Sequence, residues 1–304
     1  MLEVKDVRFG YPDCDEIIKG ISFSLVKGER LAIVGENGSG KTTLARLMCG
    51  LLAPTAGKVL IDGIDTCDPE NVFEARRRVG LVFQDPEDQI VETTVEREVG
   101  FGPGNLGLTV DEVDGRVENA ISLFRLGPLR KRPCHLLSAG EKQTVAIASI
   151  FAMRPDYIVL DESTSLLDSG SRRQAISAIE QLLGETGAGL ALISMRIEDV
   201  WMCESVMFLK DGGIGFAGDK ADLLDYFREQ KTPLSGTALF VSKMDEVLPG
   251  FVAALARGDS LSPDALAGAA RAVAPRRRAD RSYRDGASGP APGCDLNPED
   301  SPCP

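Results

Sequence analysis

Histidine is almost absent from this 304-residue sequence, whose single histidine is His135. Cysteine occurs seven times, but no two cysteines form a Cys-x-x-Cys pair. Structural zinc sites are usually built from such closely spaced cysteine and histidine ligands, and disulfide frameworks show dense, regular cysteine spacing. The sequence therefore argues against both. We expect reduced thiols that pack as small apolar side chains, and a solvated loop around His135.

Positive charge is also scarce, because 34 lysines and arginines face 46 aspartates and glutamates, which gives a net charge of −12. A protein that binds DNA or RNA through its overall surface is normally basic, so no nucleic-acid partner is expected. Long apolar runs are missing too: VAIASIFAM at 145–153 is much shorter than the roughly 20 residues of a membrane-spanning helix. The start, MLEVKDVRFGYPD, shows no basic-then-apolar leader pattern, and we expect a cytoplasmic protein whose membrane contact is peripheral.

Short continuous apolar runs are present, and they indicate strands buried on both faces of a parallel sheet. These runs lie at 31–35, 157–161, 190–194 and 205–209. They alternate with stretches of helical periodicity at 41–52, 171–185 and 197–204. Two further segments, 2–9 and 21–26, alternate polar and apolar residues as half-buried strands do. The pattern predicts an α/β fold in which helices cover a parallel sheet.

Three other regions depart from this alternation. A middle section at about 90–153 has helical periodicity, which predicts a helical insert within an α/β domain over residues 1–218. Residues 219–273 contain short helical patterns and form a predicted C-terminal extension. Residues 274–304 contain too few apolar side chains to pack, so we expect a disordered tail there.

The segment GENGSGKT at 35–42 carries the strongest functional signal. It fits the pattern G-x-x-x-x-G-K-[ST] between a predicted buried strand and a predicted helix, which is the context of a phosphate-binding loop; the alternative is a glycine-rich turn without a ligand. Glycines let backbone N–H groups surround phosphate oxygens, while Lys41 reaches the β- and γ-phosphates and Thr42 binds Mg²⁺. The predicted nucleotide-binding residues here are Gly35, Asn37, Gly38, Ser39, Gly40, Lys41, Thr42 and Thr43.

A second signal is the apolar strand YIVLDE at 157–162, which ends in two acidic residues. Asp161 is placed to hold Mg²⁺ through water, and Glu162 to orient or polarise the water that attacks the γ-phosphate. Many strands without any catalytic role also end in acidic residues. The pattern becomes informative because the phosphate-binding loop accompanies it.

A third signal is LSAGE at 137–141, which opens a predicted helix. Taken alone, it predicts only an N-terminal capping box, in which Ser138 caps the helix and Glu141 completes the box. Downstream of it lie the acidic strand and then STSLLD at 163–168, so the segment is one of an ordered set.

The order of these motifs, with Gln84 in LVFQD after an apolar strand, resembles the ATP-binding subunits of ABC transporters over about residues 2–218. The resemblance implies a P-loop NTPase fold with a helical signature subdomain, and ATP with Mg²⁺ as ligands. It also implies a dimer with a second ATPase subunit, identical or different. In such a dimer each ATP lies between the phosphate loop of one subunit and the signature of the other.

The same resemblance assigns roles to single residues. Ser138 and Gly140 would touch the partner's nucleotide, and Asp168 would order the dimer seam. Gln84 would contact the metal and sense the membrane partner. Tyr11 matches the aromatic residue that stacks on adenine, and the alternative is an ordinary tyrosine in the turn GYPD.

A narrower resemblance lies in FQDPEDQIVETTVEREVGFGPGNLGL at 83–108. This segment looks like the corresponding region of the energy-coupling factor ATPases, which drive uptake of vitamins and of transition-metal ions. The resemblance implies two membrane partners, a scaffold subunit and a substrate-binding subunit. It also implies a C-terminal extension that helps two ATPase subunits to pair.

One position departs from the family pattern. The family's histidine after the strand at 190–194 falls on Met195, whose thioether donates no hydrogen bond. Losing one preorganised donor to a transition state commonly costs on the order of 10² to 10³ in rate. We therefore expect this subunit's own site to be slow or silent, with a second ATPase subunit supplying most of the turnover, unless Ser194 or Arg196 takes over the contact.

Two rival functions follow from the same residues. A regulatory subunit that only binds ATP is favoured by Met195 and opposed by Glu162. A non-transport ABC ATPase that acts on DNA or ribosomes would usually show a coiled-coil insert, zinc-binding cysteine pairs or a second ATPase module. The sequence contains none of these three features.

Overall fold

The computed structural model describes residues 1–194, 200, 202–219, 222, 223 and 226. The chain divides into two compact units, 1–261 and 262–304, and all described residues belong to the first. Met195 and Arg196 lie outside the described residues, as do four of the eight residues of the helix predicted at 197–204, nearly all of the predicted extension and the whole predicted tail. The expectations for these segments, and the domain boundaries near them, stay predictions. Val200 is helical, but residues 202–204 are not, so the predicted helix is wrong at its C-terminal end, where the chain turns into the next strand.

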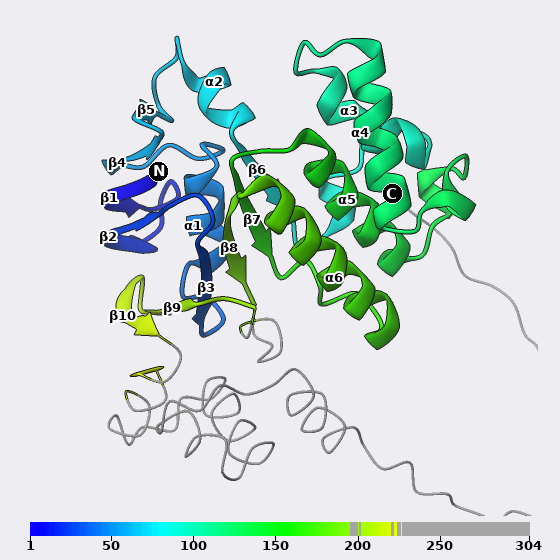
Figure 1. The fold of residues 1–304 in the computed structure, drawn as a ribbon. Coiled ribbons are helices and arrows are strands. Elements are labelled where there is room, and N and C mark those ends of the chain that lie inside the picture. Colours follow the sequence, from blue (N-terminus) through cyan, green and yellow to red (C-terminus); the bar gives the residue numbers. More distant parts are fainter. Residues whose placement is uncertain (195–199, 201, 220–221, 224–225, 227–304) are drawn as a thin grey trace, which may run out of the picture. The chain divides into compact units, whose positions relative to one another are not determined.

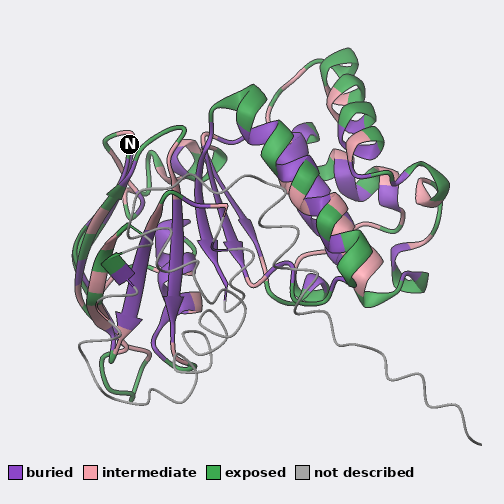
Figure 2. Ribbon diagram, turned by 60° about the horizontal axis from the view of Figure 1, so that its bottom comes forward, coloured by how far each residue is buried: buried purple, intermediate pink, exposed green. Residues whose placement is uncertain are grey.

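The larger of two sheets contains the predicted buried strands (Figure 1). In spatial order its strands are β10 (Gly213–Asp219), β9 (Ser205–Lys210), β3 (Arg30–Gly35), β8 (Gly189–Ile193), β7 (Tyr157–Asp161) and β6 (Val79–Val82). All neighbours pair in parallel except β10, which pairs antiparallel with β9. Every residue of β7 and β8 is buried, which confirms the expectation drawn from their continuous apolar runs, and β6, which was not among those runs, is fully buried as well (Figure 2).

The second sheet is antiparallel and is hydrogen-bonded as a separate ladder. Its strands, in spatial order, are β2 (Ile18–Leu25), β1 (Leu2–Phe9), β4 (Ala56–Ile61) and β5 (Ile64–Asp65). The strands predicted at 2–9 and 21–26 are confirmed as β1 and β2. Their separation into a sheet of their own, and the strands β4, β5 and β10, were not predicted.

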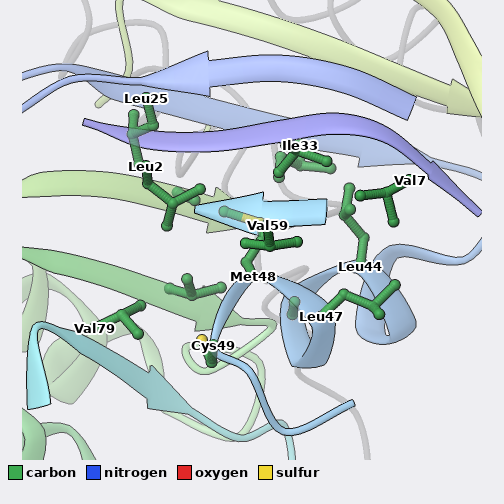
Figure 3. Close-up of a cluster of buried hydrophobic side chains, with 14 of the residues drawn as sticks. Leu2, Val7, Leu25, Ile33, Leu44, Leu47, Met48, Cys49, Val59 and Val79 are labelled. Atoms are coloured by element: carbon green, nitrogen blue, oxygen red, sulfur yellow. The ribbon is translucent and has the colours of Figure 1, made fainter. Parts of the chain in front are cut away.

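Helix α1 (Lys41–Met48) joins the two sheets through their shared core (Figure 3). Its apolar face is fully buried, and removing each such side chain from water stabilises the fold by about 1.5–3 kcal/mol. The cluster includes Leu44, Leu47 and Met48 of α1, Leu2, Val7, Leu25 and Val59 of the antiparallel sheet, and Ile33 and Val79 of the parallel sheet. The phosphate-binding loop therefore precedes the helix that holds both sheets together.

The prediction of a helix over 41–52 is wrong at its C-terminal end. α1 stops at Met48, and Gly50 adopts φ +64°, which is the left-handed conformation that ends many helices. The sequence continues as LL, whose apolar character extended the predicted periodicity past the glycine.

The helical part predicted at about 90–153 is present. It contains α3 (Val95–Gly104), α4 (Val110–Leu123) and α5 (Ala139–Met153), which pack on one another. The other helices whose bounds lie within the described residues are α2 (Val72–Arg77), α6 (Ser169–Thr186) and the short 3-10 helices η1 (Pro86–Asp88), η2 (Gly127–Leu129) and η3 (Cys134–Leu136). Within the described residues, no helix combines the length and the apolar character that crossing a membrane requires.

Candidate ATP-binding site

The phosphate-binding loop predicted at 35–42 joins the end of β3 to the start of α1. Gly40 adopts φ +98°, and a Cβ there would lie 2.7 Å from Ile18 Cδ1, so a larger residue would be both strained and crowded. A Cβ on Gly35 would lie 2.5 Å from the backbone oxygen of Leu209 on β9. The structure thus places the loop at a helix N-terminus, where backbone N–H groups suit an anion.

Lys41 opens α1 and is 7% exposed. Its Nζ donates to the backbone oxygens of Gly35 at 2.9 Å and of Glu36 at 2.8 Å. Burial lowers the pKa of Lys41, while the charges of Glu162 and Asp161 oppose this shift. The loop, the ammonium and the two predicted acids therefore form one electrostatic group.

Asp161 ends β7 and is 3% exposed. Its Oδ1 is buried without a hydrogen-bond partner, while the carboxylate accepts a hydrogen bond from the Thr42 side chain. Burial raises the pKa of Asp161, whereas the bond from Thr42 and the charge of Lys41 lower it. A carboxylate oxygen beside a hydroxyl oxygen is the donor set that Mg²⁺ prefers, so these two residues fit the predicted metal.

Glu162 follows Asp161 in a constrained backbone conformation, with φ +46°. Its N–H donates to Ile193 O at 3.0 Å, and its own carbonyl accepts from Ser165 N at 3.0 Å, so hydrogen bonds on both sides hold it there. Such conformations cost about 1–3 kcal/mol and concentrate at functional sites. The side chain of Gln84, on the segment after β6, donates from Nε2 to Glu162 Oε2 at 3.4 Å.

The predicted signature segment forms the N-terminus of α5. Ser138 Oγ accepts from Glu141 N at 3.3 Å, and Glu141 Oε2 accepts from Ser138 N at 2.8 Å, which confirms the predicted capping box. These bonds hold the pKa of Glu141 below its usual range. Gly140 leaves little space, since a Cβ there would lie 3.3 Å from Leu166 O.

Asp168 and Tyr11 have local partners. Asp168 caps α6 by accepting from the backbone N–H groups of Gly170 and Ser171, and its bonds to Ser171 lower its pKa. Tyr11 is half-buried and meets the ring of Phe9 edge-on, with centroids 5.0 Å apart. These contacts agree equally with structural roles, so the roles in the dimer seam and in adenine stacking stay predictions.

The described interactions bring together Lys41, Thr42, Asp161, Glu162 and Gln84. Those of Ser138, Asp168 and Tyr11 run to other neighbours, as given above. Two glutamines that contact the residue before Gln84, Gln89 and Gln143, were not among the predicted residues. Both also join segments about 60 positions apart, and no local pattern reveals such contacts.

A phosphate loop between a buried strand and a helix, with an acidic residue ending a nearby parallel strand, defines a P-loop nucleotide-binding domain. The model of the ABC transporter family matches residues 18–165. The "Cobalt import ATP-binding protein CbiO" of Syntrophus aciditrophicus is 39% identical over 252 residues, covering 81% of this chain and 89% of that protein. The chain belongs to the ATP-binding subunits of ABC transporters, a family of ATPases coupled to transport.

Two further relatives sharpen the comparison. The "Energy-coupling factor transporter ATP-binding protein EcfA1" of Clostridium perfringens is 41% identical over 217 residues, covering 70% of this chain and 77% of that protein. The solved structure of cbiO1 from Clostridium perfringens, described as part of the ABC transporter complex cbiONQ, superimposes with a TM-score of 0.67 at 30% identity. It covers 84% of this chain and 98% of that chain.

Proposed function

We propose that this chain is the MgATP-hydrolysing subunit of an energy-coupling factor type importer for a vitamin or a transition-metal ion. The observation that carries the proposal is the similarity to relatives named for cobalt import and for energy-coupling factor transport, each at about 40% identity over most of its length. The segment at 83–108, which resembles that group in sequence, supports the same assignment. In this proposal the protein is a peripheral subunit on the cytoplasmic face of the cell membrane.

The partners follow from the same type of transporter. We infer a membrane scaffold subunit, a separate substrate-binding membrane subunit and a second ATPase subunit, identical or different. Ser138 supports the ATPase dimer because it is exposed at the N-terminus of α5, where a helix favours an approaching anion. In that arrangement Ser138 and Gly140 face the nucleotide held by the partner's phosphate loop.

The proposed chemistry starts with binding. The loop from Gly35 to Thr43 wraps the triphosphate, and the Lys41 ammonium moves from the loop carbonyls to phosphate oxygens without losing its charge balance with Asp161. Thr42 and Asp161 would hold Mg²⁺, with Gln84 as a further contact. When bound, the metal neutralises developing charge on the phosphates.

Glu162 is the proposed group that orients water. Its carboxylate lies beside Gln84, and hydrogen bonds on both sides hold its backbone, so the position from which the side chain reaches an attacking water is set in advance. A positioned base of this type typically contributes 10²- to 10⁴-fold to a rate. Replacing Glu162 by glutamine would keep the shape and remove that contribution.

A second candidate function is an ATP-binding subunit with a slow site of its own. Met195, which is outside the described residues, motivates it, because a thioether cannot donate to the γ-phosphate. The Met195→His variant separates the two candidates in the assembled transporter. A clear rise in ATPase rate supports the slow site, and an unchanged rate rejects it.

The main test is to express the full chain in its native host, isolate it from detergent-solubilised membranes and identify what accompanies it. We expect two membrane proteins and a second ATPase subunit, together with MgATP-dependent hydrolysis and a bound vitamin or metal ion. Isolation of an active ATPase without membrane partners would reject the transporter assignment.

A further inference from the structure

Residues 83–92, between β6 and α3, carry Gln84 and form a segment held by several side chains. Its central turn is η1, and Asp85 caps that turn by accepting from Glu87 N at 3.0 Å. The segment begins where the parallel sheet ends and runs toward the helical part of the molecule. The other contacts of the segment show whether the parallel sheet or the helical part positions Gln84.

Gln89 links the residue before Gln84 to helix α5. Its Oε1 accepts from Phe83 N at 3.1 Å, and its Nε2 donates to Ala146 O at 2.8 Å and to Ser149 Oγ at 3.4 Å. The orientation of the amide is fixed chemically, because a backbone N–H needs the oxygen and a carbonyl needs the nitrogen. One side chain therefore connects the backbone beside Gln84 with the middle of α5.

Gln143 of α5 completes the attachment. It is 0% exposed, and its Nε2 donates to Phe83 O at 3.2 Å, so both backbone polar groups of Phe83 are held by side-chain amides. Gln143 Oε1 is buried without a partner, which costs about 1–3 kcal/mol. An apolar side chain at position 143 would avoid that cost. The contribution of the amide is therefore to hold the carbonyl of Phe83 in place rather than to stabilise the fold.

Helices α5 and α3 also hold the rest of the segment. Lys142 of α5 pairs with Glu87, and buried Glu98 of α3 accepts from Val91 N at 3.0 Å and from Glu92 N at 2.8 Å. Toward the parallel sheet, by contrast, the side chain of Gln84 makes one long hydrogen bond, the 3.4 Å contact to Glu162. The segment continues directly from β6, but its side-chain anchors run to the helical part, and Gln84 reaches from it toward Glu162.

We propose that Gln89, with Gln143, is a positioning residue that makes the placement of Gln84 follow helix α5. The helix that begins with the signature at Ser138 then sets how closely Gln84 approaches Glu162. A displacement of about 1 Å at a reacting centre can change a rate by about 100-fold, so a link of this stiffness affects hydrolysis. The inference rests on the proposed roles of Gln84 and Glu162.

The test uses the full chain in its assembled complex and measures single-turnover hydrolysis of MgATP labelled at the γ-phosphate, so that a slow site still yields a rate. Four variants are compared with wild type: Gln89→Met, Gln84→Ala, the double variant, and Gln174→Met as matched control. Gln174 is a half-buried glutamine of α6 that donates a single hydrogen bond to Phe124 O at 3.2 Å, away from Gln84. ATP affinity and melting temperature are measured for each variant.

The expected result is a specific pattern. Gln89→Met lowers the hydrolysis rate roughly 10-fold with ATP affinity within about twofold of wild type, and it has no further effect when Gln84 is already alanine. Gln174→Met leaves the rate unchanged at a comparable melting temperature. Gln143→Leu, which releases Phe83 from the other side, gives the same non-additive pattern if Gln89→Met does not fold.

Each contrary outcome has a distinct meaning. If Gln84→Ala leaves the rate unchanged, the assigned role of Gln84 is wrong and the inference falls with it. If Gln84→Ala slows hydrolysis but Gln89→Met does not, the site assignment stands and the positioning inference is overturned. Equal slowing by Gln89→Met with and without Gln84 also overturns it, because the effect then does not pass through Gln84.

Discussion

One aspartate lies at each end of strand β7, and the two carboxylates differ in how completely they are hydrogen-bonded. Asp62 lies beside the first residue of the strand, and Asp161 is its last residue. At the start, the side chain of Asp62 accepts from Tyr157 Oη at 2.8 Å and from Arg78 Nη1 at 3.0 Å, and it also pairs with the N-terminal ammonium. Burial alone would raise the pKa of Asp62, but these bonds outweigh it and lower the pKa to about 2. At this end the acid is matched by hydrogen-bond donors.

At the other end, Asp161 keeps an oxygen without a partner, and burial raises its pKa. A carboxylate left in this state costs stability unless another cation or donor completes it. The contrast teaches that one five-residue strand serves two purposes: its first residue, Tyr157, donates to a structural acid, Asp62, and its last residue, Asp161, is the acid proposed to bind Mg²⁺. The predictions below test this division, from the largest expected effect to the smallest.

Glu162→Gln should cause the largest loss, on the order of 10³ in the rate of ATP hydrolysis, because it removes the proposed water-orienting carboxylate and keeps the side-chain shape. Single-turnover hydrolysis measures the rate, and fluorescent ATP binding should stay within a few-fold of wild type. Equal and near-zero rates for wild type and variant would instead identify a site that only binds ATP.

Asp161→Asn should reduce Mg²⁺-dependent hydrolysis by about 100-fold, since one oxygen ligand and its charge are lost. The same change should leave the ligand-free melting temperature equal to or above that of wild type, because it removes a buried charge with an unpaired oxygen. Thermal melting with and without MgATP checks both halves. A strongly destabilised ligand-free variant would contradict the proposed division of β7.

Tyr157→Phe should lower stability and leave activity unchanged, which is the reverse of the pattern expected for Asp161→Asn. It removes one hydrogen bond from the matched end and should lower the free energy of unfolding by about 1–2 kcal/mol, with the hydrolysis rate unchanged. Urea unfolding and ATPase rates at a temperature well below the transition measure the two effects. Slower hydrolysis at unchanged stability would show that the two ends of β7 are not independent.

Asp62 and Asp161 should change the stability of the fold in opposite directions as the pH falls, because their folded pKa values are shifted in opposite directions. The folded pKa of Asp62 is depressed from 3.8 to about 2, so its contribution is present above pH 3.8 and is lost as the pH falls through 2. The stability difference between wild type and Asp62→Asn should therefore narrow as the pH falls from 4 to 2. Asp161, whose folded pKa is raised, should favour the folded state more at low pH than at neutral pH.

The smallest effect is expected for Lys27→Ala. Lys27 Nζ lies 2.6 Å from Asp156 Oδ1, beside the matched end of β7, but both side chains are largely in solvent. Exposed pairs of this kind contribute less than about 1 kcal/mol. Urea unfolding in low and high salt checks this. A loss of unfolding free energy as large as that of Tyr157→Phe would mean that the Lys27–Asp156 pair also belongs to the stabilising contacts at the start of β7.

Much of the site could be predicted from sequence because its geometry is local. The phosphate loop is fixed by glycines and by the strand and helix that flank it, and the buried strands are marked by continuous apolar runs. Capping at Ser138 depends on a residue three positions away, and it too was predicted correctly. In each case neighbours in sequence supply the physical constraint.

What could not be predicted depends on distant partners. β5 has two residues, β10 contains three glycines, and β4 has no clear alternation of polar and apolar residues, so the pairing of these strands comes from the sheet rather than from their own pattern. The contacts of Gln89 and Gln143 join residues about 60 positions apart. Asp62 gave no signal either, because its three partners come from three separate segments.

Helix α1 has a further consequence for ligand-linked protection. It carries Lys41 and Thr42 at its first turn, while its apolar face holds the antiparallel sheet against the parallel one. A ligand that binds only when this first turn is folded stabilises the whole helix. It should therefore also suppress local unfolding of the strands that pack on the helix. Amide hydrogens of β1 and β4 should then exchange more slowly with MgATP present, although neither strand belongs to the proposed site.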